Sequence, residues 1–243
     1  RQSTGVRRPC VTLCNRAIIC RLPKVIFTTM GISNTHQRSV LAAPDTDGNP
    51  DGKGAHGFLD DWRTTQPTGV VAKPQRQVLA ALFTSMLVLS ASFKYRPIRG
   101  RSNYLYWIDG QWSLSLIAPH EWSSRRRRGF AGTCTLQSDM TWTIDPSERL
   151  VEDSPVSGAI RRFFTAFAEM LNTDLTLEEI LPFYANRLPY YQRLYASALS
   201  RSLSAAVTLG NQASIGCQQW RKQFLSVENV LLVSGGQGLL SRE

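Results

Sequence analysis

The alternation of hydrophobic and polar residues is clearest between residues 103 and 144, where it predicts four short β-strands. Asp109-Gly110 lies between the first two runs and is typical of a two-residue type I′ turn, because this turn needs positive φ at both central positions. The turn pairs Ile108 with Gln111, Trp107 with Trp112 and Leu105 with Leu114. This register predicts a core face made of Leu105, Trp107, Trp112, Leu114 and Leu116.

The opposite face of this hairpin mixes aromatic, aliphatic and hydroxyl side chains, and we expect the hairpin to leave it exposed. Another part of the chain could cover this face, or it could bind a ligand. It carries Tyr104, Tyr106, Ile108, Ser113, Ser115 and Ile117. Residues 130–137 predict a third strand, with Phe130, Cys134 and Leu136 on one side, and residues 140–144 predict a fourth. Together they predict an antiparallel meander, which is too small to bury its tryptophans without helices over its core face.

Hydrophobic residues at helical spacing predict helices over residues 74–92, 155–172, 177–187 and 189–209, with a short helix around Trp220. Asp153 or Ser154 is the expected N-cap of the second helix, and Pro182 is expected to kink or shorten the third. The first helix has no charge between Arg76 and Lys94, but it is short for a bilayer and contains several hydroxyl residues. This composition favours a buried core helix over a membrane span.

These elements predict a single α+β domain over residues 73–225. A four-stranded meander over residues 93–145 packs against the preceding helix and a helical C-terminal half. Residues 30–72 are rich in turn-forming residues and predict a flexible linker, within which Phe58-Leu59 and Trp62 could dock on the core. Residues 226–243 predict a flexible tail.

The net charge of the 243-residue chain is +10, and this positive charge is concentrated in two places. Residues 1–29 form a basic leader without acidic residues, which is either an organelle transit peptide or, as we prefer, upstream sequence that is not native. Arg125, Arg126, Arg127 and Arg128 form the second cluster, and the rest of the chain is neutral. A broadly basic nucleic-acid-binding surface is therefore not predicted.

The five cysteines indicate neither a disulfide scaffold nor a metal site. Cys10, Cys14 and Cys20 lack the paired spacing of zinc ligands, and no histidine lies near them. We therefore expect no metal and no cofactor. The scattered cysteines, together with the lack of an uninterrupted apolar signal sequence, favour a reducing compartment, and we expect a cytoplasmic protein.

Four ordered motifs carry a resemblance to a known family. They are Tyr-Leu-Tyr (104–106), Ser-Leu-Ile-Ala-Pro-His-Glu-Trp (115–122), Gly-Phe-Ala-Gly (129–132) and Asp-Met-Thr-Trp (139–142). This stretch resembles the domain-of-unknown-function family 2452, whose members occur in bacteria and, as a shorter relative, in animals. The resemblance implies a related fold and a bacterial protein, and it implies no catalytic residue. The family commonly has a glycine after the Pro-x-Glu-Trp motif, where this chain has Ser123 and the arginine run.

Candidate chemistry is concentrated in the loop over residues 119–128. His120 and Glu121 are adjacent and would point apart on an extended chain, so His120 would need a distant partner such as Asp139. The competing interpretation of this polar cluster is a surface loop anchored by Trp122.

The arginine run could bind phosphate groups or an acidic surface, with Tyr104 and Tyr106 stacking on bases, or it could be a solvated charged loop. We predict a soluble, non-enzymatic interaction or adaptor domain whose partner is another protein. The first alternative is a nucleic-acid-associated protein that uses Arg125–Arg128 and the two tyrosines. The second is a small-ligand binder or enzyme centred on His120 and Glu121. Membrane association is disfavoured, and the sequence leaves the oligomeric state open.

Overall fold

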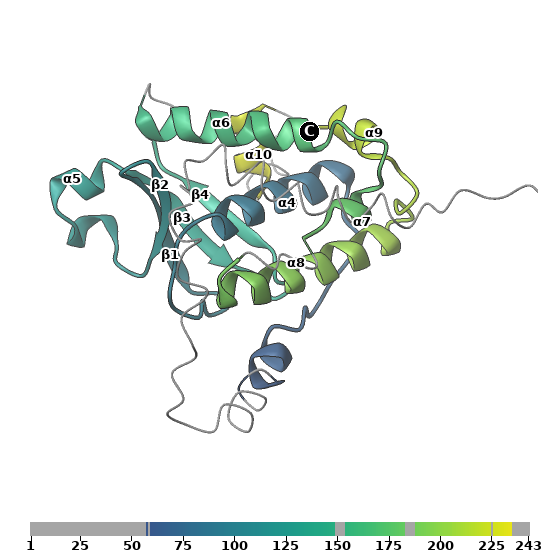
Figure 1. The fold of residues 1–243 in the computed structure, drawn as a ribbon, viewed down its shortest axis with the longest axis horizontal. Coiled ribbons are helices and arrows are strands. Elements are labelled where there is room, and N and C mark those ends of the chain that lie inside the picture. The colour runs from purple at the N-terminus through teal and green to yellow at the C-terminus, as the bar shows by residue number, and fades with distance from the viewer. Residues whose placement is uncertain (1–56, 58, 149–153, 183–187, 225, 235–243) are drawn as a thin grey trace, which may run out of the picture.

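The computed structural model describes residue 57 and residues 59–148, 154–182, 188–224 and 226–234 (Figure 1). Within these residues the chain forms one four-stranded antiparallel sheet surrounded by helices. The predicted α+β class is therefore confirmed. The basic leader and most of the predicted linker lie outside the described residues.

The hairpin forms with the predicted register. Strand β1 (Ser102–Ile108) pairs with β2 (Gln111–Ser115), with Trp107 opposite Trp112 and Leu105 opposite Leu114. Asp109 and Gly110 have φ values of 50° and 80°, which is the positive-φ pair that a type I′ turn requires. Local sequence was sufficient here because the turn itself aligns the two strands. Leu116, predicted on the core face, is 60% exposed because it lies beyond the end of β2.

The strand order is β2-β1-β3-β4, so the predicted meander connectivity is wrong at one step. Strand β3 (Phe130–Leu136) pairs with β1 rather than with β2, and β4 (Trp142–Pro146) then pairs with β3. The outer edge of β2 is already occupied, because Ser92 N–H donates to Trp112 O (2.9 Å) and Ser92 O accepts from Leu114 N–H (3.1 Å). The chain therefore crosses from β2 to the free edge of β1.

An irregularity in the β1–β3 pairing changes which face Phe130 occupies. Leu105 lies opposite Gly132, whereas the next residue, Tyr106, lies opposite Phe130, which leaves Ala131 as an extra residue in β3. Such a bulge reverses the alternation of side chains along the strand. Phe130 therefore packs against Tyr106, with ring centroids 5.5 Å apart, instead of sharing the side of Cys134 and Leu136 as predicted.

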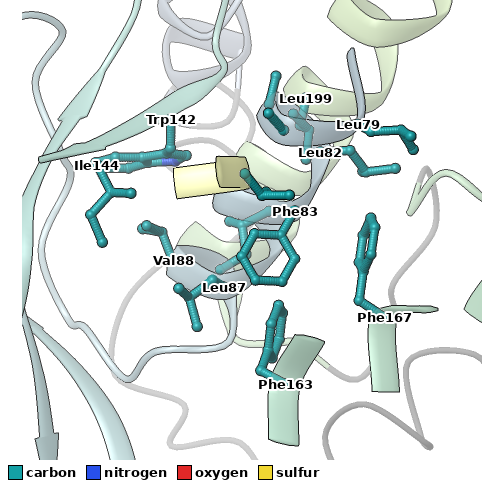
Figure 2. Packing of buried hydrophobic residues seen from close by; sticks show 14 of the residues in the cluster. Leu79, Leu82, Phe83, Leu87, Val88, Trp142, Ile144, Phe163, Phe167 and Leu199 are labelled. Carbon is teal, nitrogen blue, oxygen red and sulfur yellow. The ribbon is translucent and has the colours of Figure 1, made fainter. Parts of the chain in front are cut away.

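Helix α4 (Gln75–Leu89) is the centre of the hydrophobic core and is buried along nearly its whole length. It packs between the sheet and the helices α6 (Pro155–Met170), α8 (Tyr190–Leu209) and α10 (Val227–Ser234). Figure 2 shows Phe83 of α4 next to both Phe163 and Phe167. The ring centroids of Phe83 and these two residues are 5.3 and 5.4 Å apart. Burial of each such aromatic side chain contributes about 1.5–3 kcal/mol. Of the helices in the described residues, none is both long and apolar enough to cross a membrane.

The helix boundaries follow the predicted signals closely. Ser154 is the N-cap of α6, where its Oγ accepts from Ser157 N–H at 3.2 Å. Helix α7 (Leu177–Ile180) ends before Pro182, and residues 183–187 of the predicted third helix lie outside the described residues. Helix α9 (Cys217–Arg221) contains Trp220, and α8 ends at Leu209, the last residue of the predicted helix.

Two segments that were predicted to be flexible are ordered and docked. Residues 227–234, predicted as tail, form α10, whose Val230 and Leu231 are buried in the core cluster that includes α4 and β4. Residues 59–64, predicted as linker, are helical, and the Arg201 guanidinium carbon lies 3.9 Å from the ring centroid of Trp62. Trp62 therefore contacts α8 through Arg201, and it is not part of the hydrophobic core cluster. Both segments were misjudged because their partners lie elsewhere in the sequence.

Candidate functional site: the crossover loop

The connection from β2 to β3 folds back over the face of the sheet that is opposite the core. We call residues 116–129 the crossover loop; it contains the 3-10 helix η3 (Pro119–Glu121) and the short helix α5 (Ser124–Arg127). Helix α5 projects beyond the sheet at the edge of the molecule (Figure 1). This loop holds most of the residues that the sequence indicated as functional.

Tyr106 anchors the crossover loop to the sheet. Its hydroxyl donates to Ile117 O at 2.9 Å, and its ring meets Trp122 edge-on with a centroid distance of 6.3 Å. The side chain is 0% exposed, and this burial raises the pKa of Tyr106 to about 12. The prediction that Tyr106 is exposed and free to stack on bases is therefore wrong, because the crossover loop covers it.

Tyr104 lies two residues earlier on the same strand and remains half-buried. Its ring is 6.3 Å from that of Phe130, which fills part of the space beside it. Single-stranded nucleic acids are held by several exposed aromatic rings along a basic groove. With Tyr106 covered, this surface offers one partly exposed tyrosine in place of the predicted pair.

Glu121 and His120 have different surroundings within η3. The Glu121 carboxylate accepts from Ala118 N–H at 2.7 Å and so stabilises the start of this helical turn. The imidazole of His120 is exposed, and only its backbone oxygen takes part in holding the loop, as a weak acceptor for Arg127 at 3.5 Å. Glu121 thus has a structural role that its position three residues after Ala118 could have indicated.

Asp139 lies in the β3–β4 turn, at the opposite end of β3 from the crossover loop. A strand of this length separates the two sites by roughly 20 Å. Asp139 forms an ion pair with Lys73 at 2.6 Å, and it also accepts from the hydroxyl (2.7 Å) and the backbone N–H (3.0 Å) of Thr141. The structure therefore does not bring Asp139 together with His120 and Glu121.

The surroundings of Asp139 act on its pKa in opposite directions. Burial raises the pKa, whereas the hydrogen bonds from Lys73 and Thr141 and the charge of Lys73 lower it, and the net effect is a lowered pKa. The carboxylate is therefore charged at neutral pH and fully occupied by structural partners. Among the described residues, no three His, Cys, Asp or Glu side chains form a group that could hold a metal ion.

The arginine run is divided between structural and free groups. Arg127 donates to Pro119 O (3.1 Å) and Trp122 O (3.3 Å), so it fastens the two halves of the loop together. The guanidinium carbon of Arg126 lies 4.2 Å from the ring centroid of Trp122, and Arg125 bonds Asp109 at 3.1 Å. Arg128 has no side-chain partner within the described part of the chain. Sequence reasoning treated the four as equivalent, because the carbonyls that hold Arg127 are not visible as a motif.

Exposed apolar side chains accompany these arginines. Leu116 is 60% exposed and Ile117 is 41% exposed, both at the start of the crossover loop. All four arginines are exposed as well. The loop thus combines fixed cationic groups, which bind carboxylates or phosphates, with a small apolar area suited to a protein surface.

Two glycines of the Gly-Phe-Ala-Gly motif permit close backbone contacts at the end of the loop. A Cβ atom on Gly129 would lie 2.3 Å from Trp107 O, and one on Gly132 would lie 2.5 Å from Asp145 O. Both distances are too short for any side chain without movement of the backbone. This motif is therefore explained by how β3 packs between β1 and β4, and it needs no ligand.

Comparison with known proteins supports the resemblance indicated by the motifs. Comparisons with curated proteins and with solved structures gave no match. Residues 72–164 match a family model that is described as "Protein of unknown function (DUF2452)". The matched residues contain α4, the whole sheet, the crossover loop and the first part of α6. The chain is thus similar to this family over residues 72–164, and the resemblance carried by the four motifs is confirmed.

Proposed function

We propose that this chain is a non-enzymatic protein-interaction domain whose crossover loop binds an acidic segment of a partner protein. The observation that carries the proposal is the held arginine loop, in which Arg127 and Trp122 fix the backbone while Arg125, Arg126 and Arg128 remain exposed. Cationic groups on a rigid loop lose less conformational freedom on binding than groups on a mobile loop. Arginine in particular pairs with carboxylates through two parallel hydrogen bonds.

The exposed apolar residues at the start of the crossover loop favour a protein over a nucleic acid as the partner. Leu116 and Ile117 offer exposed aliphatic surface, which protein interfaces bury and which a phosphate backbone does not use. Burial of Tyr106 removes half of the proposed base-stacking pair. Nucleic-acid binding also depends on a broad basic face, whereas the positive charge of the crossover loop comes from one short run. The buried free thiols of Cys134 and Cys217 are compatible with the cytoplasmic location that we propose.

A direct test compares two probes of equal charge on the full chain. We would measure binding of an acidic peptide of alternating Glu and Leu, and of a single-stranded oligonucleotide, by fluorescence anisotropy. The variant carries Arg125→Ser, Arg126→Ser and Arg128→Ser and retains Arg127, because Arg127 holds the loop. Removal of three exposed charge contacts is expected to weaken peptide binding by about threefold to 150-fold, because each charged contact contributes about 0.2–1 kcal/mol.

The matched control removes three exposed arginines from other helices, as Arg76→Ser, Arg161→Ser and Arg193→Ser. It is expected to bind the peptide nearly as well as the unchanged chain does. Equal losses in both variants would show that net charge alone drives binding. Tighter binding of the oligonucleotide than of the peptide would replace this proposal with the nucleic-acid alternative.

A further inference from the structure

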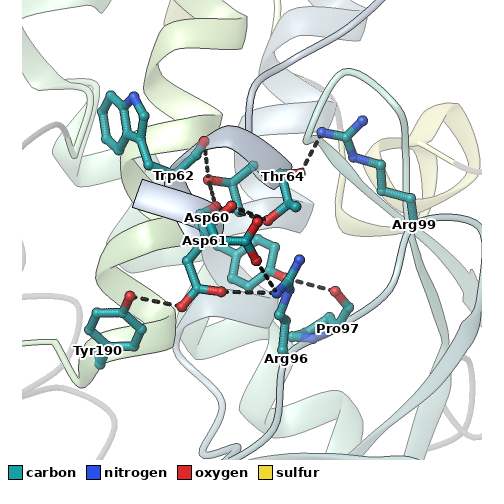
Figure 3. A network of polar contacts seen from close by, with 10 residues as sticks. Asp60, Asp61, Trp62, Thr64, Arg96, Pro97, Arg99 and Tyr190 are labelled. Atoms are coloured by element: carbon teal, nitrogen blue, oxygen red, sulfur yellow. Dashed lines mark hydrogen bonds and ion pairs between the residues drawn. The ribbon is translucent and has the colours of Figure 1, made fainter. Parts of the chain in front are cut away.

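A second cationic surface lies away from the crossover loop and is covered by the chain itself (Figure 3). Residues 59–66, which we call the docked segment, place Asp61 between Arg96 and Tyr190. Arg96 donates to one carboxylate oxygen of Asp61 at 2.9 Å, and the Tyr190 hydroxyl donates to the other at 2.8 Å. Both oxygens of one carboxylate are therefore recognised, each by a different part of the fold.

Two further arginines recognise the end of the docked segment. Arg99 donates to Thr64 O at 2.9 Å and to Gln66 O at 2.5 Å, so it caps carbonyl groups that end a helical turn. Arg201 donates to the side chain of Gln66 at 2.7 Å and stacks on the ring of Trp62. We call Arg96, Arg99, Tyr190 and Arg201 the docking surface.

The docking surface is held together by contacts that do not involve the docked segment. Arg96 and Arg99 lie on the connection between α4 and β1, whereas Tyr190 and Arg201 belong to α8. These two parts are joined by a hydrogen bond from the buried Tyr195 hydroxyl to Pro97 O at 2.7 Å. The four side chains are thus positioned by the body of the fold, as in a preformed site.

The docked segment is attached mainly through polar groups, of which the Asp61 side chain is 17% exposed and others are more accessible to water. The side chain of Arg96 is 37% exposed and that of Asp60 is 72% exposed, and Leu59 is also largely exposed. Thr65 is the one residue of the segment in the buried class. Segments with little buried apolar surface open locally before the core unfolds. The matched family residues begin at residue 72, so the docked segment also lies outside them.

We propose that the docking surface is a peptide-binding site for an acidic–aromatic helical turn, and that the docked segment is its exchangeable occupant in cis. The docked segment shows which groups the docking surface binds: two carboxylates, Asp60 and Asp61, followed by the Trp62 ring. A partner protein that carries the same arrangement competes for this surface. The short connection to the fold gives the docked segment an effective concentration of about millimolar, so it masks the surface until a stronger partner displaces it.

The test uses the full chain and a fluorescent peptide of residues 57–68 as the probe. Asp61→Asn with Trp62→Ala in the chain weakens the docked segment and is expected to increase affinity for the unchanged peptide at least tenfold over the wild-type chain. A peptide with the same two substitutions serves as the matched control and is expected not to bind. Adding Arg201→Ala to the released chain is expected to remove the gain.

The binding results distinguish an exchangeable segment from a permanent part of the fold. No peptide binding by the released chain, or equal binding by released and wild-type chains, would overturn the proposal. Exchange of the segment between two copies, seen as a stable dimer of the wild-type chain, would assign the surface to a second copy instead of a partner. Because this surface is distinct from the crossover loop, the Arg125, Arg126 and Arg128 variant is expected to retain peptide binding in the released background.

Hydrogen exchange on the wild-type chain provides a measurement that needs no substitution. The Thr65 N–H donates to Asp61 O at 3.1 Å within the docked segment. Its exchange is expected to be at least tenfold faster than that of amides in α4, because the segment opens alone. Exchange at the same rate as α4 would mean that the segment leaves only when the whole protein unfolds, and the inference would fail.

Discussion

Substitution of Gly129 by alanine tests how the crossover loop is joined to the sheet. The added Cβ atom would lie 2.3 Å from Trp107 O and 3.2 Å from the carbonyl carbon of the same residue. The obstacle is backbone, so a change of side-chain rotamer cannot relieve the clash. The same strand contact includes the hydrogen bond from Trp107 N–H to Gly129 O, at 2.7 Å. Gly129→Ala therefore forces β1 and β3 apart at this point.

The change in stability can be assembled from three terms. Overpacking at a fixed position costs about 1–3 kcal/mol, and weakening of a backbone hydrogen bond costs about 1 kcal/mol. The reduced entropy of the unfolded chain returns about 0.4–1 kcal/mol. We expect a net loss of about 1–3.6 kcal/mol in the free energy of unfolding, which lowers Tm by about 2–14 °C for a domain of this size.

The assay is urea unfolding followed by tryptophan fluorescence, with Gly158→Ala as the matched control. Gly158 lies inside α6, where a Cβ atom would meet only Arg162 Nη1 at 3.5 Å, an ordinary contact. The control is expected to stabilise the protein by about 0.5–1 kcal/mol, because alanine favours helix over glycine. If Gly129→Ala were as stable as the unchanged protein, the close approach of the two strands would be refuted.

Two other substitutions test the surroundings of the sheet. Asp139→Asn leaves Lys73 unpaired at a site where both side chains are nearly buried, at 13% and 11% exposure, and is expected to cost about 3 kcal/mol. The pKa of Asp139 is lowered in the fold from its usual 3.8, because the effects of Lys73 and Thr141 outweigh that of burial. The ionised carboxylate therefore contributes to the free energy of unfolding above pH 3.8, and this contribution is lost as pH falls through the lowered pKa. Measurement of the free energy of unfolding as a function of acid pH checks this. The same pH dependence in Asp139→Asn and in the unchanged protein would contradict it. Tyr106→Phe removes the hydrogen bond to Ile117 O and is expected to cost about 1 kcal/mol in the same urea assay; no loss would mean that the loop is held without it.

The candidate site shows how far residue types alone can be interpreted. The sequence correctly drew attention to the crossover loop as the place where charge and aromatic residues meet. It did not show that Arg127 is used internally, since its acceptors are backbone carbonyls with no sequence signature. It also suggested a possible partnership of His120 with Asp139, which strand β3 keeps apart. The chemistry of each residue can be read from the sequence, whereas which residues contact one another depends on the tertiary structure.

The docked segment shows that sequence alone also failed to predict which segments are ordered. Asp60, Asp61 and Trp62 follow a turn-rich stretch, and their composition predicted a linker. Their partners are Arg96, Tyr190 and Arg201, which lie far along the chain and become neighbours only after folding. Helix α10 escaped prediction for a similar reason, since its apolar residues are ordered by the core that they join.

What the sequence determined by itself is local. The Asp109-Gly110 turn set the register of the hairpin, and Ser154 set the start of α6, because each acts through groups only a few residues away. Only the tertiary structure decided that β3 pairs with β1 and that Ala131 forms a bulge, and hence that Tyr106 is buried. These features follow from competition for strand edges and for space beneath the crossover loop. That competition is between segments distant in sequence, and it is resolved by which arrangement buries the most apolar surface with its hydrogen bonds satisfied.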